Sequence, residues 1–355
     1  MSRRDIARRA AVEVSFAGVD ITRSIRPYLL SLTYTDNEED ETDDLQIKLQ
    51  DREAIWTESW LDELIKATAA SRMKIDAVIA TRNWNGDGGD VVLPCGLFEL
   101  DSVSAEGPPN TVTIKATALP FSASIRQTKK NRVWEAYYLS GIANQMCSEA
   151  GMTCMYLSAD DPYFEREEQV KTSDIAFLSE LCHNSGISLK VTNNIVVLFD
   201  QRDYESRPEV MTITRGDGSY TRHSIGTSAA ETQYASCRVS YVDPRNGQCI
   251  EGIAKTEDYN DDATDNQQLE ISARVASVAE AEQLAEKLLR LHNKFSRTCS
   301  FTLPGSPGLV AGVTVRLARW GDWSGKYIIK QATHSVSGSG GYTTQINLRR
   351  VLEGY

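Results

Sequence analysis

The feature that most constrains the fold is an alternation of apolar and polar residues that runs through residues 12–119 and returns after residue 208. In LSLTY (30–34) and LQIKLQD (45–51), apolar side chains occupy every second position, as in strands with one buried face. Ala17-Gly18 interrupts the first run and predicts a hairpin turn. Both ends of the chain are therefore predicted to form antiparallel sheets of the barrel or sandwich kind.

The segment between these ends has helical spacing. In residues 133–151, four large apolar residues recur at steps of four, namely Trp134, Tyr138, Ile142 and Met146. This spacing predicts an amphipathic helix that Gly151 ends. A second helix is predicted after Ser173 as N-cap, with a stripe of Ile175, Leu178, Leu181 and Cys182. A hairpin turning at Asn193-Asn194 would complete a small α+β module.

One more helix is predicted in the last part of the chain, over residues 277–295. Ser277 and Glu280 have the spacing of a capping box. The chain thus divides into a first β-barrel domain (1–125), an α+β module (126–205) and a second β-barrel domain (206–355) that contains this helix. The predicted fold class is α+β and mainly β.

Two stretches suggest that the barrels are related. GLFELDSVS (96–104) and GKYIIKQAT (325–333) share a glycine, an aromatic residue at +2, an aliphatic residue at +4 and a small apolar residue at +7. Each precedes a short turn and a threonine-rich strand. We interpret them as parts of a duplicated domain. Chance similarity between two amphipathic hairpins is the alternative.

An acidic run separates the first two long strands. Its carboxylates are Asp36, Glu38, Glu39, Asp40, Glu41, Asp43 and Asp44. A second run contributes Asp258, Asp261, Asp262 and Asp265. Neither run has the glycine and ligand spacing of a calcium loop. A solvated hairpin tip is therefore favoured over a metal cage in both places.

Charge and cysteine content exclude several classes of protein. The net charge is −11, which disfavours stable binding to nucleic acid. Seven cysteines, odd in number and never spaced as Cys-x-x-Cys, predict neither a disulfide framework nor a zinc site. The N-terminal arginines precede no apolar segment, so we expect neither a signal peptide nor membrane insertion. No cofactor or metal is predicted.

No spacing of residues defines a catalytic site. Cys182 and His183 are neighbours on a predicted helix and point about 100° apart, and the motifs of common hydrolases are missing from the sequence. A cell-wall (peptidoglycan) hydrolase remains the rival hypothesis. Its candidate acids are Asp160, Asp161, Glu165, Glu167 and Glu168. A sugar-binding module is a third possibility, which the scarcity of clustered aromatic residues disfavours.

The stretch YLLSLTYTDNEEDETDDLQIKLQDREAIW (28–56) resembles an N-terminal block of the phage late control gene D protein family. These are baseplate hub proteins of contractile phage tails, tailocins and related injection systems. The matching residues are Tyr34, Asp36, Asp44, Leu45, Ile47, Leu49, Asp51, Arg52 and Trp56. The likeness continues through residues 164–189, 196–206 and 325–351, so it covers nearly the whole chain.

The resemblance implies a non-enzymatic homotrimer in the baseplate, assembled in the bacterial host cytoplasm. Three chains with two similar barrels each would present six barrels, which adapt a sixfold tail tube to a threefold central spike. The implied partners are a separate spike protein below, a tail tube or tube-initiator protein above, and a tape measure protein in the lumen. Any hydrolase would be another chain.

Two further expectations concern assembly. Edge strands of neighbouring barrels should pair and close a continuous inner sheet, because an open sheet leaves edges that need a partner. The two acidic runs should line the lumen or the adjoining ring, where they would weakly repel DNA or acidic protein in transit. The alternative is that both runs lie outside and only aid solubility.

Overall fold

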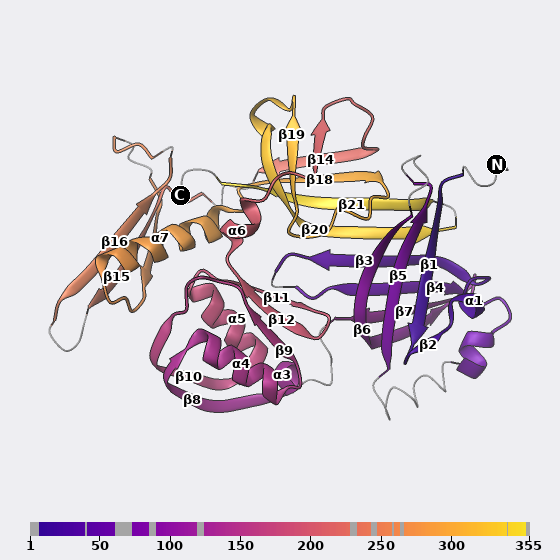
Figure 1. Ribbon diagram of the computed structural model, residues 1–355, viewed down its shortest axis with the longest axis horizontal. Helices are drawn as coiled ribbons and strands as arrows, with labels where there is room; N and C mark the ends of the chain where they lie inside the picture. The colour runs from indigo at the N-terminus through magenta and orange to yellow at the C-terminus, as the bar shows by residue number, and fades with distance from the viewer. Residues whose placement is uncertain are drawn as a thin grey trace.

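The computed structural model describes residues 7–39, 41–60, 73–84, 90–118, 124–227, 233–242, 247–257, 259–262, 266–338 and 340–352. The fold is mainly β, and its dominant element is one 13-stranded sheet. Strands from the two ends of the chain lie side by side in this sheet, with the module and a helix-covered subdomain beside them (Figure 1). The predicted α+β, mainly β class is confirmed.

The first end of the chain supplies seven strands to this sheet: β1 (Arg9–Phe16), β2 (Val19–Asp20), β3 (Leu29–Asn37), β4 (Asp44–Gln50), β5 (Lys74–Arg82), β6 (Val91–Glu106) and β7 (Thr111–Thr117). The short helices α1 (Thr22–Ile25) and η2 (Trp56–Trp60) lie between them. The last part of the chain supplies six: β13 (Met211–Thr214), β14 (Arg222–Thr227), β18 (Arg297–Pro304), β19 (Thr314–Ala318), β20 (Gly325–Ser337) and β21 (Gly341–Arg350). The short 3₁₀ helix η3 (Gly321–Trp323) precedes β20.

The two groups of strands join through β3 and β20. Residues 31–37 of β3 pair antiparallel with residues 331–337 of β20, so the sheet runs without a break from one group to the other. The predicted pair of barrels is not confirmed, because in the described ranges the sheet stays open and closes no barrel. The edge of β3 is occupied by β20 and is not available to close the first group of strands on itself.

The alternating pattern explains why these segments form strands. In β4, Leu45, Ile47 and Leu49 are buried, and the residues between them are more exposed. The first group of strands surrounds one apolar core, and the last group surrounds another that includes Phe301, Trp320 and Tyr327. Burial of one face of each strand provides the main stabilisation, about 25 cal/mol per Å² of apolar surface.

The last and first groups of strands repeat the same topology. The order β5–β6–β7–β4–β3 corresponds to β19–β20–β21–β18–β14. The ladder of β6 with β7 is irregular between Leu100 and Ser102, and that of β20 with β21 is irregular between Ile329 and Gln331. Each irregularity follows its strand's glycine at the same spacing. These two topological units, which we call unit 1 (β1–β7) and unit 2 (β13, β14 and β18–β21), support the predicted duplication.

The backbone conformation explains why glycine occupies both of these positions in the repeat. Gly96 has φ of +106° and Gly325 has φ of +142°, a region that residues with a Cβ rarely adopt. Gly96 pairs with Ala77 of β5, and Gly325 pairs with Leu317 of β19. Both glycines therefore hold corresponding positions in the two ladders.

The middle of the chain forms the module. Its elements are α3 (Ser124–Gln127), β8 (Lys129–Tyr138), α4 (Leu139–Glu149), β9 (Thr153–Tyr156), β10 (Tyr163–Ser173), α5 (Asp174–Asn184), β11 (Ser188–Thr192), β12 (Ile195–Phe199) and α6 (Gln201–Glu205). The predicted second helix, its Ser173 N-cap position and the turn at Asn193-Asn194 are confirmed. The predicted start of the first helix is wrong, because Trp134 lies on β8 and the helix begins at Leu139.

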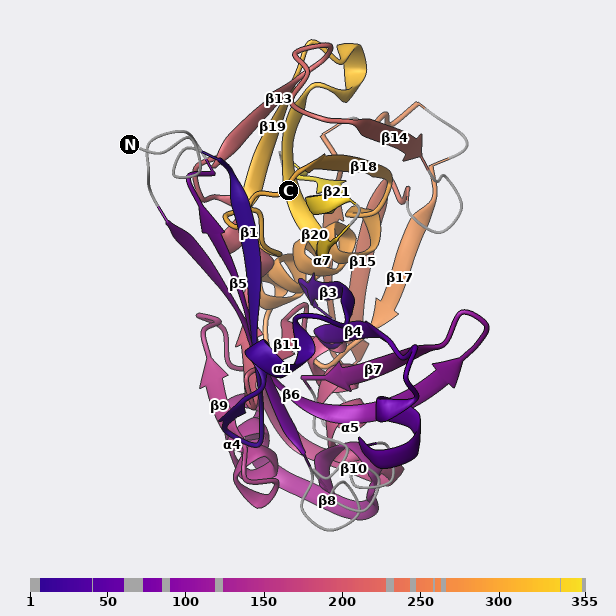
Figure 2. The ribbon, with the colours of Figure 1, turned by 90° about the vertical axis from the view of Figure 1, so that its right-hand side faces the viewer.

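A separate subdomain is inserted between β14 and β18. It consists of β15 (Ser236–Val242), β16 (Cys249–Lys255) and β17 (Gln268–Ser272), covered by α7 (Val278–Asn293). It has an apolar core of its own. It lies at the end of the molecule away from unit 1 (Figure 1), and therefore behind unit 1 in the view of Figure 2. The predicted capping box is present: Glu280 N donates to Ser277 Oγ at 3.2 Å, and Glu280 Oε2 accepts from Ala276 N at 2.7 Å.

Candidate functional site: a buried junction and two free sheet edges

The first acidic run lies in the turn between β3 and β4, where unit 1 meets the rest of the molecule. Asp36, Glu38, Glu39 and Asp43 are 1–6% exposed, so the prediction of a solvated tip is wrong for these four. Only Glu41 and Asp44 are exposed, and Asp40 lies outside the described residues. The four buried carboxylates are stabilised by cations that come from distant parts of the chain.

We call this set of buried charged groups the junction network. Its members are Asp36, Glu38, Glu39, Asp43, Lys190, Glu205, Lys294 and Arg349. They come from the end of β3, the β3–β4 turn, β11, α6, the end of α7, and β21. The network therefore joins both units, the module and the inserted subdomain.

Arg349 is the centre of this network. Its guanidinium donates to both oxygens of Glu38, at 2.9 and 2.6 Å, and also to Glu205. Arg349 is 0% exposed. Burial alone would lower its pKa, but the carboxylates of Glu38 and Glu205 outweigh burial and raise the pKa of Arg349. Burial also raises the pKa of Glu38, against the opposing effect of Arg349.

Glu39 binds three groups from three other elements. Lys294, at the C-terminal end of α7, donates to Glu39 Oε1. Ser188 Oγ and Gln201 Nε2 each donate to Glu39 Oε2 at 2.6 Å. Burial favours the neutral acid, but Lys294, Ser188 and Arg349 together outweigh burial and lower the pKa of Glu39. Glu39 is thus held as a carboxylate between the module and the inserted subdomain.

Lys190 of β11 forms ion pairs with the two remaining carboxylates, Asp36 and Asp43. Its Nζ lies 2.5 Å from Asp36 Oδ1 and 3.6 Å from Asp43 Oδ1. Asp36 Oδ2 also accepts from Ala311 N at 2.9 Å, which ties unit 2 to the same group. Burial raises the pKa of Asp43 to about 7, with Lys190 opposing the rise.

A chain of side-chain amides continues the junction across the sheet. Gln331 Nε2 donates to Asn37 Oδ1 at 2.8 Å, and Asn347 Nδ2 donates to Gln331 Oε1 at 2.8 Å. Asn37 Nδ2 in turn donates to Thr42 O at 2.7 Å. Buried polar networks whose members are satisfied fix one arrangement of the elements they join. This network accordingly fixes how the parts of the chain sit together.

The second acidic run lies in the inserted subdomain, after β16. Asp261 and Asp262 are exposed, and Asp261 accepts from Lys255 Nζ at 2.8 Å. Asp258 and Asp265 lie outside the described residues. The two runs therefore differ in burial, and the prediction that acidic side chains line a lumen or an adjoining ring now concerns Glu41, Asp44, Asp261 and Asp262.

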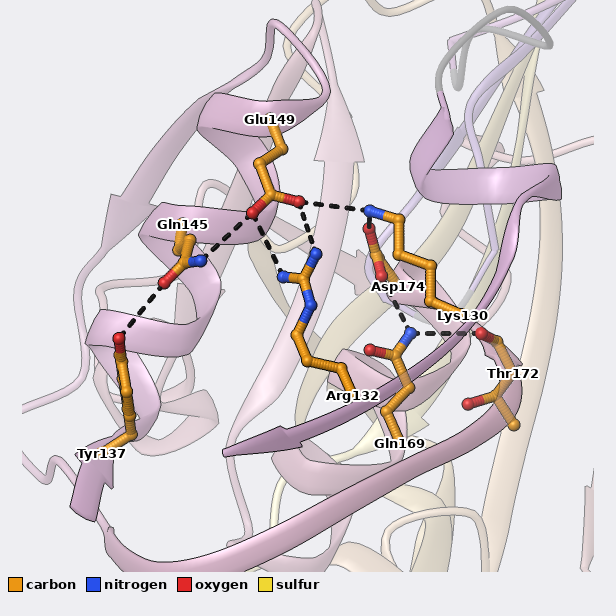
Figure 3. Close-up of polar contacts among 8 residues, drawn as sticks. All are labelled: Lys130, Arg132, Tyr137, Gln145, Glu149, Gln169, Thr172 and Asp174. Carbon is orange, nitrogen blue, oxygen red and sulfur yellow. Dashed lines mark hydrogen bonds and ion pairs between the residues drawn. The ribbon is translucent and has the colours of Figure 1, made fainter. Parts of the chain in front are cut away.

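A second polar cluster holds the module together (Figure 3). Glu149 lies in the last turn of α4, where the helix dipole disfavours a negative charge. Arg132 Nη2 donates to Glu149 at 2.7 Å, and Lys130 Nζ lies 3.2 Å from Glu149 and 2.5 Å from Asp174. The hydrogen bond from Arg132 is the main cause that lowers the pKa of Glu149 to about 2. Gln169 Nε2 donates to Asp174 at 2.8 Å, so β8, β10, α4 and α5 are tied together.

The candidate acids of a hydrolase lie in or near one cleft between the module and the inserted subdomain. The cleft has a volume of about 950 Å³, and Asp160, Asp161, Glu165 and Glu167 line it, whereas Glu168 does not. Asp161 binds Ser140 N and Oγ at 2.9 and 2.6 Å, at the start of α4. These contacts hold the start of the helix.

The other acids that line the cleft differ in their contacts. Asp160 pairs with Lys287, and Glu165 pairs with Arg274 at 2.6 Å. Both contacts join the module to the inserted subdomain. Burial raises the pKa of Glu167, and Glu180 adds to the rise. A raised pKa is the property expected of a general acid, so Glu167 is the member of this set with suitable chemistry.

The described residues contain neither a membrane span nor a metal cluster. No helix in the described residues is both long and apolar enough to cross a bilayer. No group of three or more histidine, cysteine, aspartate or glutamate side chains in those ranges is placed to hold a metal ion.

Each unit also has a sheet edge that lies open in the part of the chain that the structure describes. All six residues of β14 are exposed, and β14 pairs only with β18. Residues 101–106 of β6 pair only with β7, since β5 pairs with the earlier half of β6. Exposed edges present unpaired backbone groups and are surfaces for strand addition.

Solved structures with the same fold come from phage tails and related systems. The tail protein from Neisseria meningitidis MC58 aligns with a TM-score of 0.69 at 11% identity, over 96% of this chain and 97% of that chain. The 43 kDa tail protein of prophage MuSo2 from Shewanella oneidensis aligns with a TM-score of 0.65 at 12% identity, over 96% and 98%. A Francisella PdpA-VgrG complex contains a similar chain, with a TM-score of 0.55 at 8% identity, over 100% and 55%. The fold is that of phage tail proteins.

A family model described as phage tail baseplate hub (GPD) matches residues 95–340. The chain belongs to this family, as the sequence resemblance predicted. The probable baseplate hub proteins of Escherichia phages P2 and 186 are 25% and 26% identical to it over 237 residues. These alignments cover 64% of this chain and 55% of each relative, so the chain spans about half the length of the curated relatives it matches. Membership makes it a baseplate component of a phage-type tail.

Proposed function

We propose that this chain is a structural baseplate hub that assembles as a homotrimer and adapts a sixfold tail tube to a threefold central spike. The duplication carries this proposal, because unit 1 and unit 2 repeat one strand order and one bulge position. Three chains would present six similar units to a sixfold tube. They would present three copies of the rest of the chain to a threefold spike.

In this proposal the chain divides at the positions that the sequence predicts. Residues 1–125 and 206–355 contain the two tube-forming domains, each completed into a barrel wall by its neighbours in the ring, and residues 126–205 form the module between them. A tail tube or tube-initiator protein binds above, a spike protein binds below, and a tape measure protein occupies the lumen. The fold's presence in a complex with a second protein, PdpA-VgrG, supports a partner of this kind.

The junction network is suited to a chain that transmits force. A hub transmits force between tube and spike during contraction, so its parts must keep their relative positions. Arg349, Lys294 and Lys190 fix the two units, the module and the inserted subdomain through buried ion pairs. Removing one partner of such a pair is strongly destabilising.

The copy number tests this proposal. Native mass spectrometry of the purified chain and quantitative mass spectrometry of assembled particles should both give three copies per hub. A chain that is monomeric in assembled particles, or present in six copies, contradicts the trimeric adaptor.

A cell-wall hydrolase is the second candidate, and the cleft beside Glu167 is the observation that favours it. Lysis of a peptidoglycan suspension by the purified chain, abolished by Glu167→Gln and retained in Glu168→Gln, would support this function. Glu168 is the matched control because it lies outside the cleft lining. Turbidity that stays constant with the purified chain argues for a purely structural hub.

A further inference from the structure

The two long strands of the repeat differ in what covers their second halves. In unit 2, residues 331–337 of β20 pair with β3 on the edge opposite β21. In unit 1, the corresponding half of β6, from Ser102 to Glu106, pairs with β7 alone among the described residues. The site that receives a strand in unit 2 is therefore open in unit 1.

The equivalent strands β3 and β14 also differ in whether their outer edge is paired. β3 is covered by β20, and its core-facing Tyr34 is 5% exposed. β14 holds the corresponding place in unit 2, next to β18 as β3 is next to β4. Its core-facing Ile225 is 38% exposed. Among the described residues of the two repeated units, the edge of β14 and the second half of β6 are thus both open.

The paired ladders fix which residues correspond. Ser102 and Gln331 are the first paired residues after the bulge in their strands, opposite Lys115 and Asn347. Lys115 pairs with Gln46, and Asn347 pairs with Ser300.

The next ladder outward completes the correspondence. Gln46 pairs with Thr33, and Ser300 pairs with Ser224. Thr33 thus corresponds to Ser224, and Tyr34 to Ile225. Along the receiving strands, by the same spacing, His334 corresponds to Ala105.

We propose that β14 of one chain pairs antiparallel with residues 102–106 of β6 in the next copy of the same chain, in the register that β3 and β20 use within one chain. His334 pairs with Tyr34 in the chain, so Ala105 of one copy lies opposite Ile225 of the next. By the same rule Ser104 lies opposite Gly226, and Glu106 lies opposite Ser224. This inference rests on the proposed homotrimer and specifies its interface.

The chemistry of the two edges fits this pairing. Ile225 is exposed within one chain, and a neighbouring strand would cover it as β20 covers Tyr34. Glu106 and Arg222 would lie on the same face as diagonal neighbours, a distance at which opposite charges attract. The contact is head-to-tail, and because it repeats the contact within the chain, the same step made six times closes a ring of three chains.

Disulfide cross-linking tests the register. In a Cys249→Ser background, which removes the exposed native thiol, the in-register pair is Ala105→Cys with Ile225→Cys. The matched control is Ala105→Cys with Ser224→Cys, because a shift of one residue moves the second thiol to the opposite face of the sheet. All three target positions are exposed, so the substitutions are expected to leave folding intact.

Under mild oxidation the in-register variant should give covalent trimers on a non-reducing gel, and the shifted control should give at least about tenfold less. Amide exchange measured by mass spectrometry should also slow in residues 102–106 and 223–227 on trimer formation, as expected for newly paired strands. Equal cross-linking in both variants, or no cross-link and no added protection in a chain that is trimeric by native mass, overturns the strand pairing. A chain that is monomeric in assembled particles overturns the proposed trimer itself.

Discussion

The connection that follows the equivalent strands β3 and β14 differs between the two units in length and in composition. In unit 1, β3 is joined to β4 by a short turn made almost entirely of acidic residues. In unit 2, β14 is joined to β18 by residues 228–296, which contain the inserted subdomain. The end of that subdomain supplies Lys294 to Glu39 in the short turn. The two connections occupy equivalent places in the two units, and they contact each other through the buried pair of Lys294 and Glu39.

This comparison shows how two units with a repeated strand order are tied together. The two units keep their strand order, and they differ at the positions where they meet. Position 349 in β21 is an arginine, and the corresponding position in β7 is Thr117, since Leu348 and Ala116 hold equivalent places before them. Arg349 binds two carboxylates across the junction, whereas Thr117 makes a local bond to Thr42 at 2.9 Å.

The largest expected effect is a difference in the free energy of unfolding between substitutions at these two positions. Arg349→Met leaves Glu38 buried without its ion-pair partner and leaves Glu205 with Arg290 alone. This change should destabilise the chain by about 3–5 kcal/mol. Thr117→Val at the equivalent place removes the hydrogen bonds of one hydroxyl but breaks no ion pair, and should cost about 1 kcal/mol. Urea denaturation followed by circular dichroism measures both. Equal effects at the two positions would show that the junction does not stabilise the chain.

The contact between the two connections can be isolated by a double-mutant cycle. Lys294→Met leaves Glu39 buried and unpaired, and should destabilise the chain by about 3 kcal/mol. Adding Glu39→Gln removes the unpaired charge, so the double variant should recover about half of that loss. The midpoint of urea unfolding is the measurement. An additive pair of effects would mean that Lys294 and Glu39 do not stabilise each other.

Much of this fold could be predicted from the sequence, because strands and turns depend on near neighbours. The alternation in Leu45–Leu49, the capping residues Ser277 and Glu280, and the turn at Asn193 are all local patterns, and the structure has them. The prediction that Trp134 lies on the helix was wrong because a strand can also bury an aromatic residue. Trp134 lies on β8, which pairs with β10.

The junction network could not be predicted in this way. Glu38 lies 311 positions from Arg349 in the sequence, and Glu39 lies 255 positions from Lys294. A run of carboxylates with no basic residue beside it is typical of a solvated loop, so the pattern favours exposure. The pairing of β3 with β20 places β21 and its Arg349 near these carboxylates, and the packing of β11 and of the end of α7 brings Lys190 and Lys294. No local signal encodes these long-range contacts.

A smaller effect should appear in the dependence of stability on pH. His334 of β20 is buried, where Tyr342 and Leu309 bind its two ring nitrogens at 2.8 and 3.1 Å. Burial lowers the pKa of His334 to about 4. Between pH 4 and 6.5, His334 is protonated more often in the unfolded chain than in the folded chain. The stability that His334 contributes is therefore complete above pH 6.5 and is lost as the pH falls towards 4.

His334→Gln should reduce this loss by on the order of 2 kcal/mol. The corresponding residue of unit 1, Ala105, does not titrate. Urea midpoints of His334→Gln and of the unsubstituted chain at several pH values test this, and an unchanged slope in His334→Gln contradicts the assignment.

The smallest effect is expected from the acidic groups that are exposed. Glu41→Gln, Asp261→Asn and Asp262→Asn together should change the unfolding free energy by less than about 1 kcal/mol, because exposed charges contribute little. Trimer formation should be unaffected. Slower release of the payload from particles that carry the triple variant would support a lumenal position, and unchanged release would place these groups outside the path of the payload.

The most direct test of the account is the symmetry of the hub in an averaged electron-microscopy map of the tail tip. We predict three chains of 39.4 kDa around the axis, with unit 1 and unit 2 alternating as six similar walls of one continuous inner sheet. A map with six copies of this chain, or with three copies whose units 1 and 2 lie at different levels along the axis, would contradict it.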